Sequence, residues 1–459
     1  MTQNSFAKLD FSTAWLDNLD HLGYVEMTAI QARALPLMLA GKDVVGKANT
    51  GTGKTAAFGL ALLSKIEPAS ELPGALVLCP TRELAAQVAE EIRRLARPVA
   101  NTNVITVTGG ASLDRQRRSL EHGVDVVVGT PGRLLDHLRR ESLDLSNVET
   151  LVFDEADRML DMGFFDDVAA IAEATPKQRQ TLLFSATAND AVRELGERFQ
   201  DDATLISVAD VESTPDITQI LYELGDADPM EALQRVLAHH DLDSAVIFCN
   251  QRDTTDMVAD TLRKAGYSVD SLHGGMEQRD RDDVLLQFGN GSLRFLVATN
   301  VAARGIDIDE IDGVINYELP RDPKEFIHRV GRTGRAGETG LAISLVGRYG
   351  HNKIDRIGGI LEDVVPTSIE TLPAAQATPR PAPMKTVVIR GGRKNKLRAG
   401  DIVGALTGEL NIDNDTIGLI TIGERVAFVA MERSVAELAC ERIDAGKIKG
   451  RRFRAHMLG

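Results

Sequence analysis

Two series of short apolar segments alternate with helix-like segments along most of this chain, and they constrain the fold more than any other feature. The first series lies between Ala75 and Thr187, and the second lies between Ser244 and Val346. The apolar segments are rich in β-branched residues, which is typical of buried strands. Strand, loop and helix repeated in this order predict a parallel sheet covered by helices. The chain should therefore contain two tandem α/β domains.

Segments without this alternation mark the predicted domain boundaries. An acidic stretch of low periodicity, residues 208–216, is the predicted linker between α/β domains at 1–207 and 217–365. Residues 366–384 hold five of the 16 prolines of the chain, which predicts an extended spacer. Residues 385–459 read as strand, helix, strand, strand, helix, strand. This order predicts a small α+β domain with a split β-α-β-β-α-β topology, similar to an RNA-recognition fold.

The charge of the chain is unevenly distributed. The net charge of −15 argues against a nucleic-acid partner, but residues 376–459 contain 15 Lys and Arg against nine Asp and Glu. A basic segment on an acidic body predicts a local surface for a polyanion, although such a segment can also be a solvated face. No signal pattern and no apolar run of about 20 residues is present, and the three cysteines are isolated. We therefore expect a cytoplasmic protein without a membrane partner, and the sequence does not fix its oligomeric state.

A glycine-rich segment after Val44 and Val45 predicts a phosphate loop. It consists of Ala48, Asn49, Thr50, Gly51, Thr52, Gly53, Lys54 and Thr55, and a helical pattern follows. Such a loop turns backbone N–H groups towards phosphate oxygens at a helix N-terminus, while Lys54 reaches the β- and γ-phosphates and Thr55 ligates Mg²⁺. Because Ala48 replaces the first glycine of the general pattern, a glycine-rich turn without a ligand is the alternative.

Adjacent carboxylates at the end of a predicted strand support the nucleotide-binding interpretation. Asp154, Glu155 and Asp157 follow the apolar residues Leu151–Phe153, at the sheet edge where α/β proteins bind ligands. Asp154 suits the ligand shell of Mg²⁺, and Glu155 suits a general base that orients water onto the γ-phosphate. The alternative is an acidic helix cap, which would account for Asp157 alone.

The second α/β domain offers positive charge for phosphoryl transfer. Arg329, Arg332 and Arg335 recur at three-residue spacing, so they can point from one face of a helix or turn. An arginine finger can raise the rate by about 10³–10⁵, and hydrolysis would then depend on closure of the two domains. The alternative is a basic surface helix.

With these motifs in this order, the chain from Phe6 to about residue 365 resembles a DEAD-box RNA helicase, a family with two RecA-like domains. The other matching segments are Gly23 to Gln31, Pro80 to Ala85, Gly109-Gly110, Thr130 to Arg133, Ser185 to Thr187, Val246 to Arg252, His273-Gly274 and Ala298 to Asp307. The resemblance implies ATP and Mg²⁺ as cofactors and RNA as the substrate. It also implies that Phe6 stacks on adenine, that Gln31 hydrogen-bonds its edge and that Asp307 holds the ribose.

The same resemblance assigns further roles. The implied catalytic residues are Lys54, Asp154, Glu155, Arg332 and Arg335, and the implied coupling residues are Asp157, Ser185, Thr187 and His328. The implied RNA contacts are Arg82, Gly110, Thr130, Arg133, Arg252, Gly274 and Thr299. Backbone amides, hydroxyls and arginines suit phosphates and 2′-OH groups rather than base edges. We therefore expect the two RecA-like domains to prefer RNA without reading its sequence.

The basic C-terminal domain resembles the RNA-binding domain of a group of bacterial DEAD-box proteins that is tied to the large ribosomal subunit. The matching stretches are Arg390–Leu397, Gly400–Gly404 and Lys447–Arg454. Phe428 is the single aromatic residue in Arg425–Met431, where a generic RNA-recognition sheet would stack several bases. We therefore expect RNA to be held by a basic loop and the final strand, through Arg393, Lys394, Lys396, Lys449, Arg451 and Arg452. The alternative is a protein-interaction module with a solvated basic face.

Three functions remain open at this level. The first is an ATP-dependent RNA helicase that acts on 23S-type ribosomal RNA and on large-subunit assembly intermediates. The second is an ATP-gated RNA clamp that binds without productive unwinding, and the third is a DNA-directed relative. The sequence favours the first, because the basic domain and its spacer would deliver turnover to one particular RNA, whereas intact Glu155 and Arg335 indicate only the capacity for hydrolysis.

Overall fold

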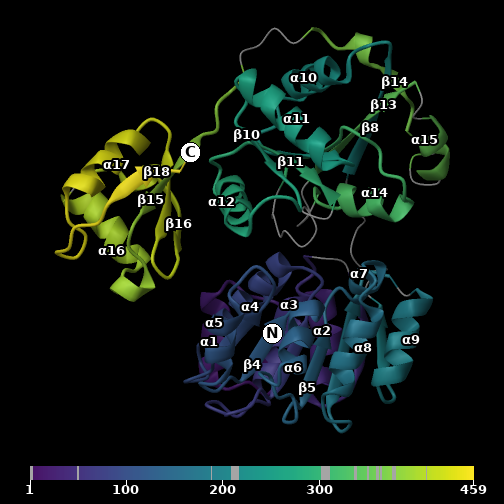
Figure 1. Cartoon of the computed structure of the whole chain (residues 1–459), viewed down its shortest axis with the longest axis vertical. Helices are drawn as coiled ribbons and strands as arrows, with labels where there is room; N and C mark the ends of the chain where they lie inside the picture. The colour runs from purple at the N-terminus through teal and green to yellow at the C-terminus, as the bar shows by residue number, and fades with distance from the viewer. Residues whose placement is uncertain are drawn as a thin grey trace. The chain divides into compact units, whose positions relative to one another are not determined.

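The computed structural model (Figure 1) describes most of the 459-residue chain. The residues outside the description are 1–3, 49–50, 188, 208–216, 301–310, 335–338, 349–350, 358–360, 362–363, 375–378, 410 and 459. The chain divides into two compact units, and the boundary between them falls within residues 208–216. The predicted interdomain linker therefore lies outside the described residues.

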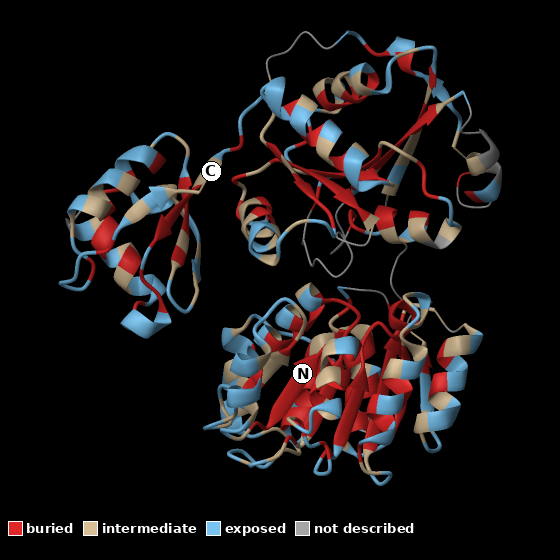
Figure 2. Cartoon of the chain, in the orientation of Figure 1, coloured by how far each residue is buried: buried red, intermediate tan, exposed pale blue. Residues whose placement is uncertain are grey.

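The first unit is built on a parallel sheet of seven strands in the order β3-β4-β2-β5-β6-β1-β7. The strands are β1 (Val44–Lys47), β2 (Ala75–Leu78), β3 (Val104–Val107), β4 (Val126–Gly129), β5 (Thr150–Phe153), β6 (Gln180–Ser185) and β7 (Thr204–Ser207). Strands β2, β4, β5 and β6 are buried along their whole length (Figure 2). Burial on both faces of the sheet explains why their sequences are continuous apolar runs rather than alternating ones.

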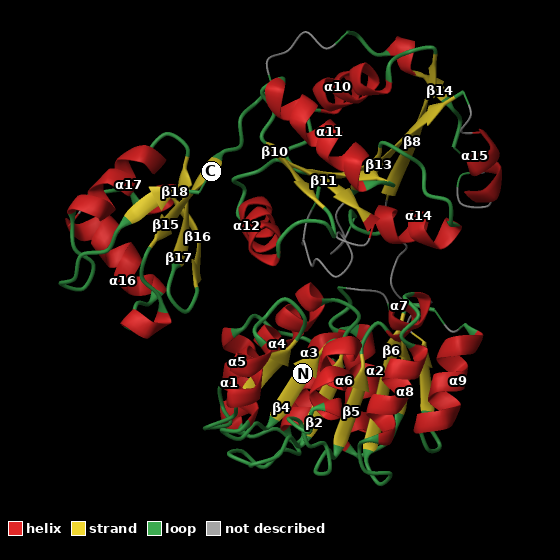
Figure 3. Cartoon of the chain, viewed as in Figure 1, coloured by secondary structure: helices red, strands yellow, loops and turns green. Residues whose placement is uncertain are grey.

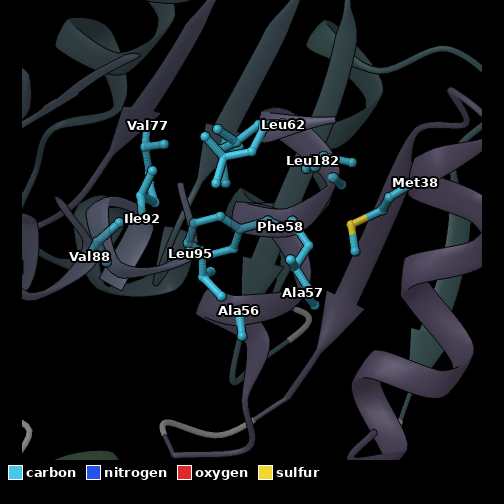
Figure 4. Close-up of a cluster of buried hydrophobic side chains, with 14 of the residues drawn as sticks. Met38, Ala56, Ala57, Phe58, Leu62, Val77, Val88, Ile92, Leu95 and Leu182 are labelled. Atoms are coloured by element: carbon cyan, nitrogen blue, oxygen red, sulfur yellow. The ribbon is translucent and has the colours of Figure 1, made fainter. Parts of the chain in front are cut away.

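Helices cover both faces of this sheet. They are α1 (Thr13–His21), α2 (Ala29–Leu39), α3 (Lys54–Leu63), α4 (Arg82–Leu95), α5 (Leu113–Leu120), α6 (Pro131–Arg139), α7 (Ala156–Asp161), α8 (Phe165–Glu173) and α9 (Asp190–Phe199). Helix α3 is the most apolar of them, and Phe58 and Leu62 on it pack with Val77, Ile92 and Leu182 (Figure 4). This packing fixes α3, and hence the loop before it, on the central strands.

The second unit begins with another parallel sheet of seven strands, in the order β10-β11-β9-β12-β13-β8-β14. The strands are β8 (Ile217–Gly225), β9 (Ala245–Cys249), β10 (Val269–Leu272), β11 (Phe295–Thr299), β12 (Gly313–Asn316), β13 (Gly340–Gly347) and β14 (Thr367–Ser368). The helices are α10 (Pro229–His240), α11 (Arg252–Lys264), α12 (Gln278–Gly289), α14 (Pro323–Val330) and α15 (His351–Ile357). The prediction of two tandem α/β domains is thus confirmed.

A small antiparallel sheet forms the C-terminal domain (Figure 3), with the strand order β16-β17-β15-β18. Its strands are β15 (Met384–Ile389), β16 (Ile417–Ile422), β17 (Ala427–Glu432) and β18 (Ala455–Met457), and its helices are α16 (Ala399–Gly404) and α17 (Ala436–Ala445). The predicted β-α-β-β-α-β order is confirmed. No helix in the described part of the chain is long and apolar enough to cross a membrane.

The proline-rich segment, predicted as an extended spacer, makes specific contacts in its described parts. Its first residues form β14, which pairs with β8, and Ile369 is fully buried. Farther along, the guanidinium of Arg380 lies 2.8 Å from a carboxylate oxygen of Asp241. At the start of the C-terminal domain, Asn290 Nδ2 donates to Thr386 Oγ1 over 2.9 Å, and both residues are buried. Specific contacts of its described parts therefore hold the segment on the second α/β domain.

Candidate nucleotide and RNA site

The predicted phosphate loop connects β1 to the N-terminus of α3. Gly51 and Gly53 have φ values of +86° and +84°, in the left-handed region that favours glycine. A Cβ on Gly53 would also lie 2.6 Å from Gln31 Nε2. Glycine at position 53 is therefore required by both the backbone conformation and the close approach of α2. Two further residues of the predicted loop, Asn49 and Thr50, lie outside the described residues.

Lys54 and Asp154 form a buried ion pair at the base of the loop. Lys54 Nζ lies 3.3 Å from Asp154 Oδ1, and neither side chain is more than 5% exposed. Burial raises the pKa of Asp154, and the charge of Lys54 only partly offsets this effect. Burial alone would lower the pKa of Lys54, but the negative charges of Asp154, Glu155 and Asp157 outweigh it and raise this pKa. The ammonium charge is thus kept in place where the loop would receive phosphate oxygens.

The Asp154 carboxylate also suits its predicted role as a metal ligand. Neither of its oxygens has a hydrogen-bond partner apart from the ion pair with Lys54, which is unusual for a fully buried carboxylate. The described residues contain no group of three His, Cys, Asp or Glu side chains that could hold a metal ion. Mg²⁺ needs no such group, because it is usually held by one or two protein oxygens together with phosphates and water. The carboxylate of Asp154 and the hydroxyl of Thr55 suit this mode of binding.

Glu155 has a strained backbone and a fixed side chain. It precedes α7 with a φ of +53°, in a region that non-glycine residues rarely occupy. Its carboxylate forms an ion pair with Arg158, and both side chains are buried. Strain of this kind persists where the surrounding structure imposes it, often at functional sites. The sequence interpretation did not identify Arg158, although its three-residue spacing from Glu155 was a signal for such a pair.

The predicted coupling residues of the first unit contact one another. Asp157 Oδ2 accepts hydrogen bonds from the backbone N–H of Thr187 at 2.9 Å and from its hydroxyl at 3.0 Å. Ser185 Oγ donates to the carbonyl of Thr187 over 2.6 Å. The backbone N–H of Ala48 donates to the carbonyl of Ser185 over 3.1 Å. A continuous set of hydrogen bonds therefore links α7, the Ser185–Thr187 segment and the start of the phosphate loop.

The two predicted adenine contacts have different surroundings. Gln31 is buried on α2, where its Nε2 donates to the carbonyl of Gly53 over 3.0 Å and its Oε1 accepts from the N–H of Thr28. The sequence thus places this glutamine directly on the phosphate loop. Phe6 is only 3% exposed and packs edge-on against Tyr24, with the ring centroids 6.4 Å apart. The stacking of Phe6 on adenine stays a prediction.

The predicted RNA contacts of the first unit gather around the loop between β3 and α5. A Cβ on Gly109 would lie 2.7 Å from Arg82 Nη2, so the guanidinium rests against the glycine backbone. Gly110 follows with a φ of +81°. Arg133 Nη1 donates to the carbonyl of Ala111 over 3.0 Å. Three chain segments, far apart in sequence, thus present arginines and backbone groups at one edge of the sheet.

The predicted RNA contacts of the second unit lie at neighbouring strand ends. Arg252 begins α11 directly after β9, and its Nη2 would lie 3.6 Å from a Cβ on Gly274, which follows β10. Thr299 ends β11, where it is paired in register with Cys249 of β9. Because β10, β11 and β9 are neighbours in this parallel sheet, the three residues lie at the same edge of it, and their contact with RNA stays a prediction. Asp307, the predicted ribose contact, lies outside the described residues.

The arginines of the second unit differ in their surroundings. Arg332 is 7% exposed, whereas Arg335 lies outside the described residues. Arg329 is 2% exposed, and its guanidinium donates to the side chains of Asn250, Asn300 and Asn316. It also lies over the ring of Phe248, 5.0 Å from the centroid. Arg329 therefore organises the interior of this domain, a role that three-residue spacing did not reveal.

Comparison with known proteins agrees with this geometry. The family model of DEAD/DEAH box helicases matches residues 28–195, the helicase conserved C-terminal domain matches 228–337, and the DbpA RNA binding domain matches 386–456. The ATP-dependent RNA helicase DbpA of Escherichia coli K12 is 47% identical over 446 residues, which cover 97% of each chain. The chain belongs to the DEAD-box RNA helicase family.

Two other relatives of this DEAD-box helicase match its two RecA-like domains. The DEAD-box ATP-dependent RNA helicase CshA of Geobacillus kaustophilus is 43% identical over 343 residues, which cover 74% of this chain and 73% of the relative. The solved structure of Saccharomyces cerevisiae Dbp5 bound to RNA and ADP BeF3 is 32% identical, with a TM-score of 0.72. That match covers 80% of this chain and 96% of the other. The helicase thus carries a DbpA RNA-binding domain in addition to a widespread ATP-dependent core.

In the DbpA RNA-binding domain the predicted basic loop and final strand lie side by side. The N–H of Arg390 donates to the carbonyl of Arg454 over 2.8 Å, and a Cβ on Gly391 would collide with the ring of Phe453. This close packing brings the loop that carries Arg393, Lys394 and Lys396 next to the segment that carries Lys449, Arg451 and Arg452. Lys394 and Lys449 form exposed ion pairs with Glu424 and Asp401. Such pairs contribute little and leave the cations accessible to a polyanion.

Proposed function

We propose that this helicase separates short RNA duplexes when its two RecA-like domains close on one ATP and one RNA strand. The observation that best supports coupling is the hydrogen-bonded link from Asp157 through Thr187 and Ser185 to Ala48. Through this link, a structural change near the γ-phosphate would alter the hydrogen bonds of the Ser185–Thr187 segment at the end of β6. A nucleotide site of a simple binding protein would not need such a connection.

In this proposal Lys54 contacts the β- and γ-phosphates, Asp154 and Thr55 hold Mg²⁺, and Glu155 orients the attacking water. Bound Mg²⁺ would neutralise charge on the β- and γ-phosphate oxygens. Arg158 keeps the Glu155 carboxylate in one orientation through their ion pair. Gln31 and Phe6 would bind adenine, Asp307 the ribose, and Arg332 and Arg335 the γ-phosphate, with His328 supporting the coupling.

Strand separation would follow from bending of the bound strand. Arg82, Gly110, Thr130 and Arg133 in the first domain, with Arg252, Gly274 and Thr299 in the second, would hold its backbone. A base-paired partner cannot follow a sharp bend, so pairs at the site would open. Each base-pair step costs about 1.4 kcal/mol, taking the DNA value as a guide. One closure can therefore open only a few pairs, which limits the enzyme to short duplexes.

We further propose that the C-terminal domain directs this activity to 23S-type ribosomal RNA in large-subunit assembly intermediates, in the cytoplasm. The match to the DbpA RNA binding domain and the paired basic loop and final strand support a specific RNA anchor. The single Phe428 of β17 supports a grip by charged side chains rather than by base stacking on the sheet.

Strand displacement tests the proposal directly. A short RNA duplex flanking a hairpin of large-subunit ribosomal RNA should be separated faster than the same duplex without the hairpin, and only with ATP. The Arg393→Gln/Lys396→Gln variant should lose this preference. The charge-matched control Arg198→Gln/Arg348→Gln, which removes two exposed ion-paired arginines elsewhere, should keep it. Retention of the duplex with ATP-dependent binding would instead identify an RNA clamp, and equal ATPase stimulation by DNA would contradict RNA specificity.

A further inference from the structure

A buried hydrogen-bond network lies beneath the RNA-facing loop of the first RecA-like domain. It consists of Arg133, Gln116, His137 and Ser142, and we refer to it as the Arg133 network. Gln116 is 7% exposed and His137 is fully buried, although both residues are polar. Neither belongs to a motif that the proposed function uses. Buried polar side chains of this kind cost stability unless their hydrogen bonds are made, so their presence calls for an explanation.

Gln116, on α5, is the centre of this network. Its Nε2 donates to the carbonyl of Thr108 over 2.9 Å. Its Oε1 lies 2.7 Å from Arg133 Nη1 and 3.1 Å from His137 Nε2. Because an arginine can only donate, the amide oxygen must face Arg133 and the amide nitrogen must face Thr108. The orientation of the Gln116 amide is therefore determined by its partners.

The hydrogen-bond roles of His137 follow from this orientation. Nε2 must carry a proton to donate to Gln116 Oε1, so the neutral ring has an unprotonated Nδ1. Nδ1 lies 2.8 Å from Ser142 Oγ, which can donate to it. Burial lowers the pKa of His137, and the charge of Arg133 lowers it further. The neutral ring is thus favoured, and its unprotonated Nδ1 can accept the hydrogen bond from Ser142 Oγ.

Two acceptors orient Arg133, the side chain of Gln116 on α5 and a backbone carbonyl of the RNA-facing loop. The same Nη1 that contacts Gln116 also donates to the carbonyl of Ala111 over 3.0 Å. Thr108 and Ala111 flank the Gly109-Gly110 pair, so Gln116 binds both the loop backbone and the arginine. Loss of Gln116 would remove one of the two acceptors that orient Arg133 and leave the Thr108 carbonyl and the His137 N–H without these partners.

We propose that Gln116 is a positioning residue for RNA binding: it fixes the Arg133 guanidinium against the Gly109-Gly110 loop before RNA arrives. This inference rests on the proposed role of Arg133 as an RNA contact. A pre-oriented guanidinium loses less conformational freedom on binding a phosphate than a mobile one does. Gln116 thus acts on RNA affinity through Arg133 and has no contact with the nucleotide loop among the hydrogen bonds of the described residues.

The test compares Gln116→Ala with Arg133→Ala and with the double variant, in the full-length protein. The RNA concentration that half-saturates ATPase stimulation should rise about tenfold in Gln116→Ala, as expected for loss of one hydrogen bond to a charged group. Affinity for a fluorescent ATP analogue should be unchanged. Gln116→Glu keeps an acceptor for Arg133 but cannot donate to the Thr108 carbonyl, so it should restore only part of the RNA affinity. Ser119→Ala is the matched control, because among the described residues this exposed side chain on α5 bonds only to the carbonyl of Arg115.

The outcomes separate this inference from the proposed function. If Gln116 acts through Arg133, the double variant should bind RNA no more weakly than Arg133→Ala alone. Additive losses in the double variant, or unchanged RNA affinity in Gln116→Ala while Arg133→Ala is weakened, would overturn the positioning role alone. Unchanged RNA affinity in Arg133→Ala would instead overturn the proposed RNA contact on which the inference rests. A loss of ATP-analogue affinity in Gln116→Ala would indicate general damage to the domain and would also contradict the inference.

Discussion

Replacement of Lys54 by methionine should destabilise the first RecA-like domain even without nucleotide. Methionine keeps the length and apolar stem of the side chain but removes the ammonium group, whose nitrogen lies 3.3 Å from Asp154 Oδ1. Asp154 is fully buried, and its oxygens have no other hydrogen-bond partner. The variant therefore retains an unpaired buried carboxylate. It should also lose ATP turnover, because Lys54 is the proposed contact to the β- and γ-phosphates.

The expected loss of stability follows from the cost of one unpaired buried charge. Removing one member of a buried pair costs about 3–5 kcal/mol. For a domain of about 200 residues, each kcal/mol shifts the melting temperature by about 2–4 °C, so the shift should be about 6–20 °C. Without Lys54 the largest effect that opposes burial is lost, and the pKa of Asp154 should rise further. Protonation then relieves the cost at low pH.

The pH dependence gives this prediction a definite sign. A carboxyl group whose pKa is raised on folding binds its proton more tightly in the folded state than in the unfolded state. The free energy of unfolding therefore falls as the pH rises from the unfolded pKa of about 3.9 towards the folded value. The stability difference between wild type and Lys54→Met should consequently be smaller at pH 5 than at pH 8.

Thermal unfolding of the full-length protein, followed by scanning calorimetry at both pH values, measures these differences. Lys54→Met/Asp154→Asn should be more stable than Lys54→Met, because the unpaired charge has been removed. Lys65→Met is the matched control: its ammonium donates to the neutral side chain of Gln180 over 2.7 Å and interacts with Asp43 and Glu149 only at longer range, so its loss breaks no direct ion pair among the described residues. The reasoning would be refuted if Lys54→Met had the same melting temperature as wild type, or if the double variant were no more stable than the single one.

Three further predictions concern other parts of the helicase. Gln31→Ala loses the contact to the Gly53 carbonyl and the proposed contact to adenine, so its selectivity for ATP over GTP in competition binding should fall at least about tenfold. Thr187→Val loses the hydroxyl bond to Asp157 and should hydrolyse more ATP per separated duplex than wild type; an unchanged ratio would contradict the coupling role. Arg329→Lys cannot reproduce the planar contacts to three asparagines, and urea unfolding should show the second RecA-like domain destabilised by about 2–4 kcal/mol.

Local sequence patterns predicted the parts of the fold that depend on residues adjacent in the sequence. The continuous apolar runs of β2, β4 and β5 could be identified because both faces of these strands are buried. Strand β8 was not identified, because its mixed sequence, ITQILYELG, is only partly buried. The proline-rich segment was predicted as an extended spacer, and its contacts were not predicted, because composition reports backbone stiffness but not partners. Arg380 in the segment and Thr386 just after it contact residues more than 90 positions away.

In the candidate site, too, short motifs could be recognised in the sequence, whereas the residues that contact them could not. The phosphate loop and the carboxylates could be found because each motif is short and its chemistry requires fixed spacing. Arg158 and Gln116 were not assigned roles, because each acts on a functional residue through contacts that the fold creates. Arg329 was grouped with the arginines for phosphoryl transfer, and its three asparagine partners were not foreseen. A buried arginine or glutamine has no distinctive local pattern. Its role becomes visible only when its hydrogen-bond partners are known.

The nucleotide-binding and RNA-binding regions of the first domain differ in how far their polar side chains have hydrogen-bond partners before a ligand binds. This difference bears on how ATP and RNA would cooperate. On the nucleotide side the fold leaves Asp154 without hydrogen-bond partners other than Lys54 and holds Glu155 in a strained conformation. A ligand that brings Mg²⁺ would relieve the first of these costs, so part of its binding energy stabilises the domain. On the RNA side Gln116 already satisfies the loop and Arg133. RNA would therefore meet a surface whose shape is set in advance, whereas ATP would change the energetics of Asp154 and Glu155, close in sequence to Asp157, to which Thr187 is hydrogen-bonded.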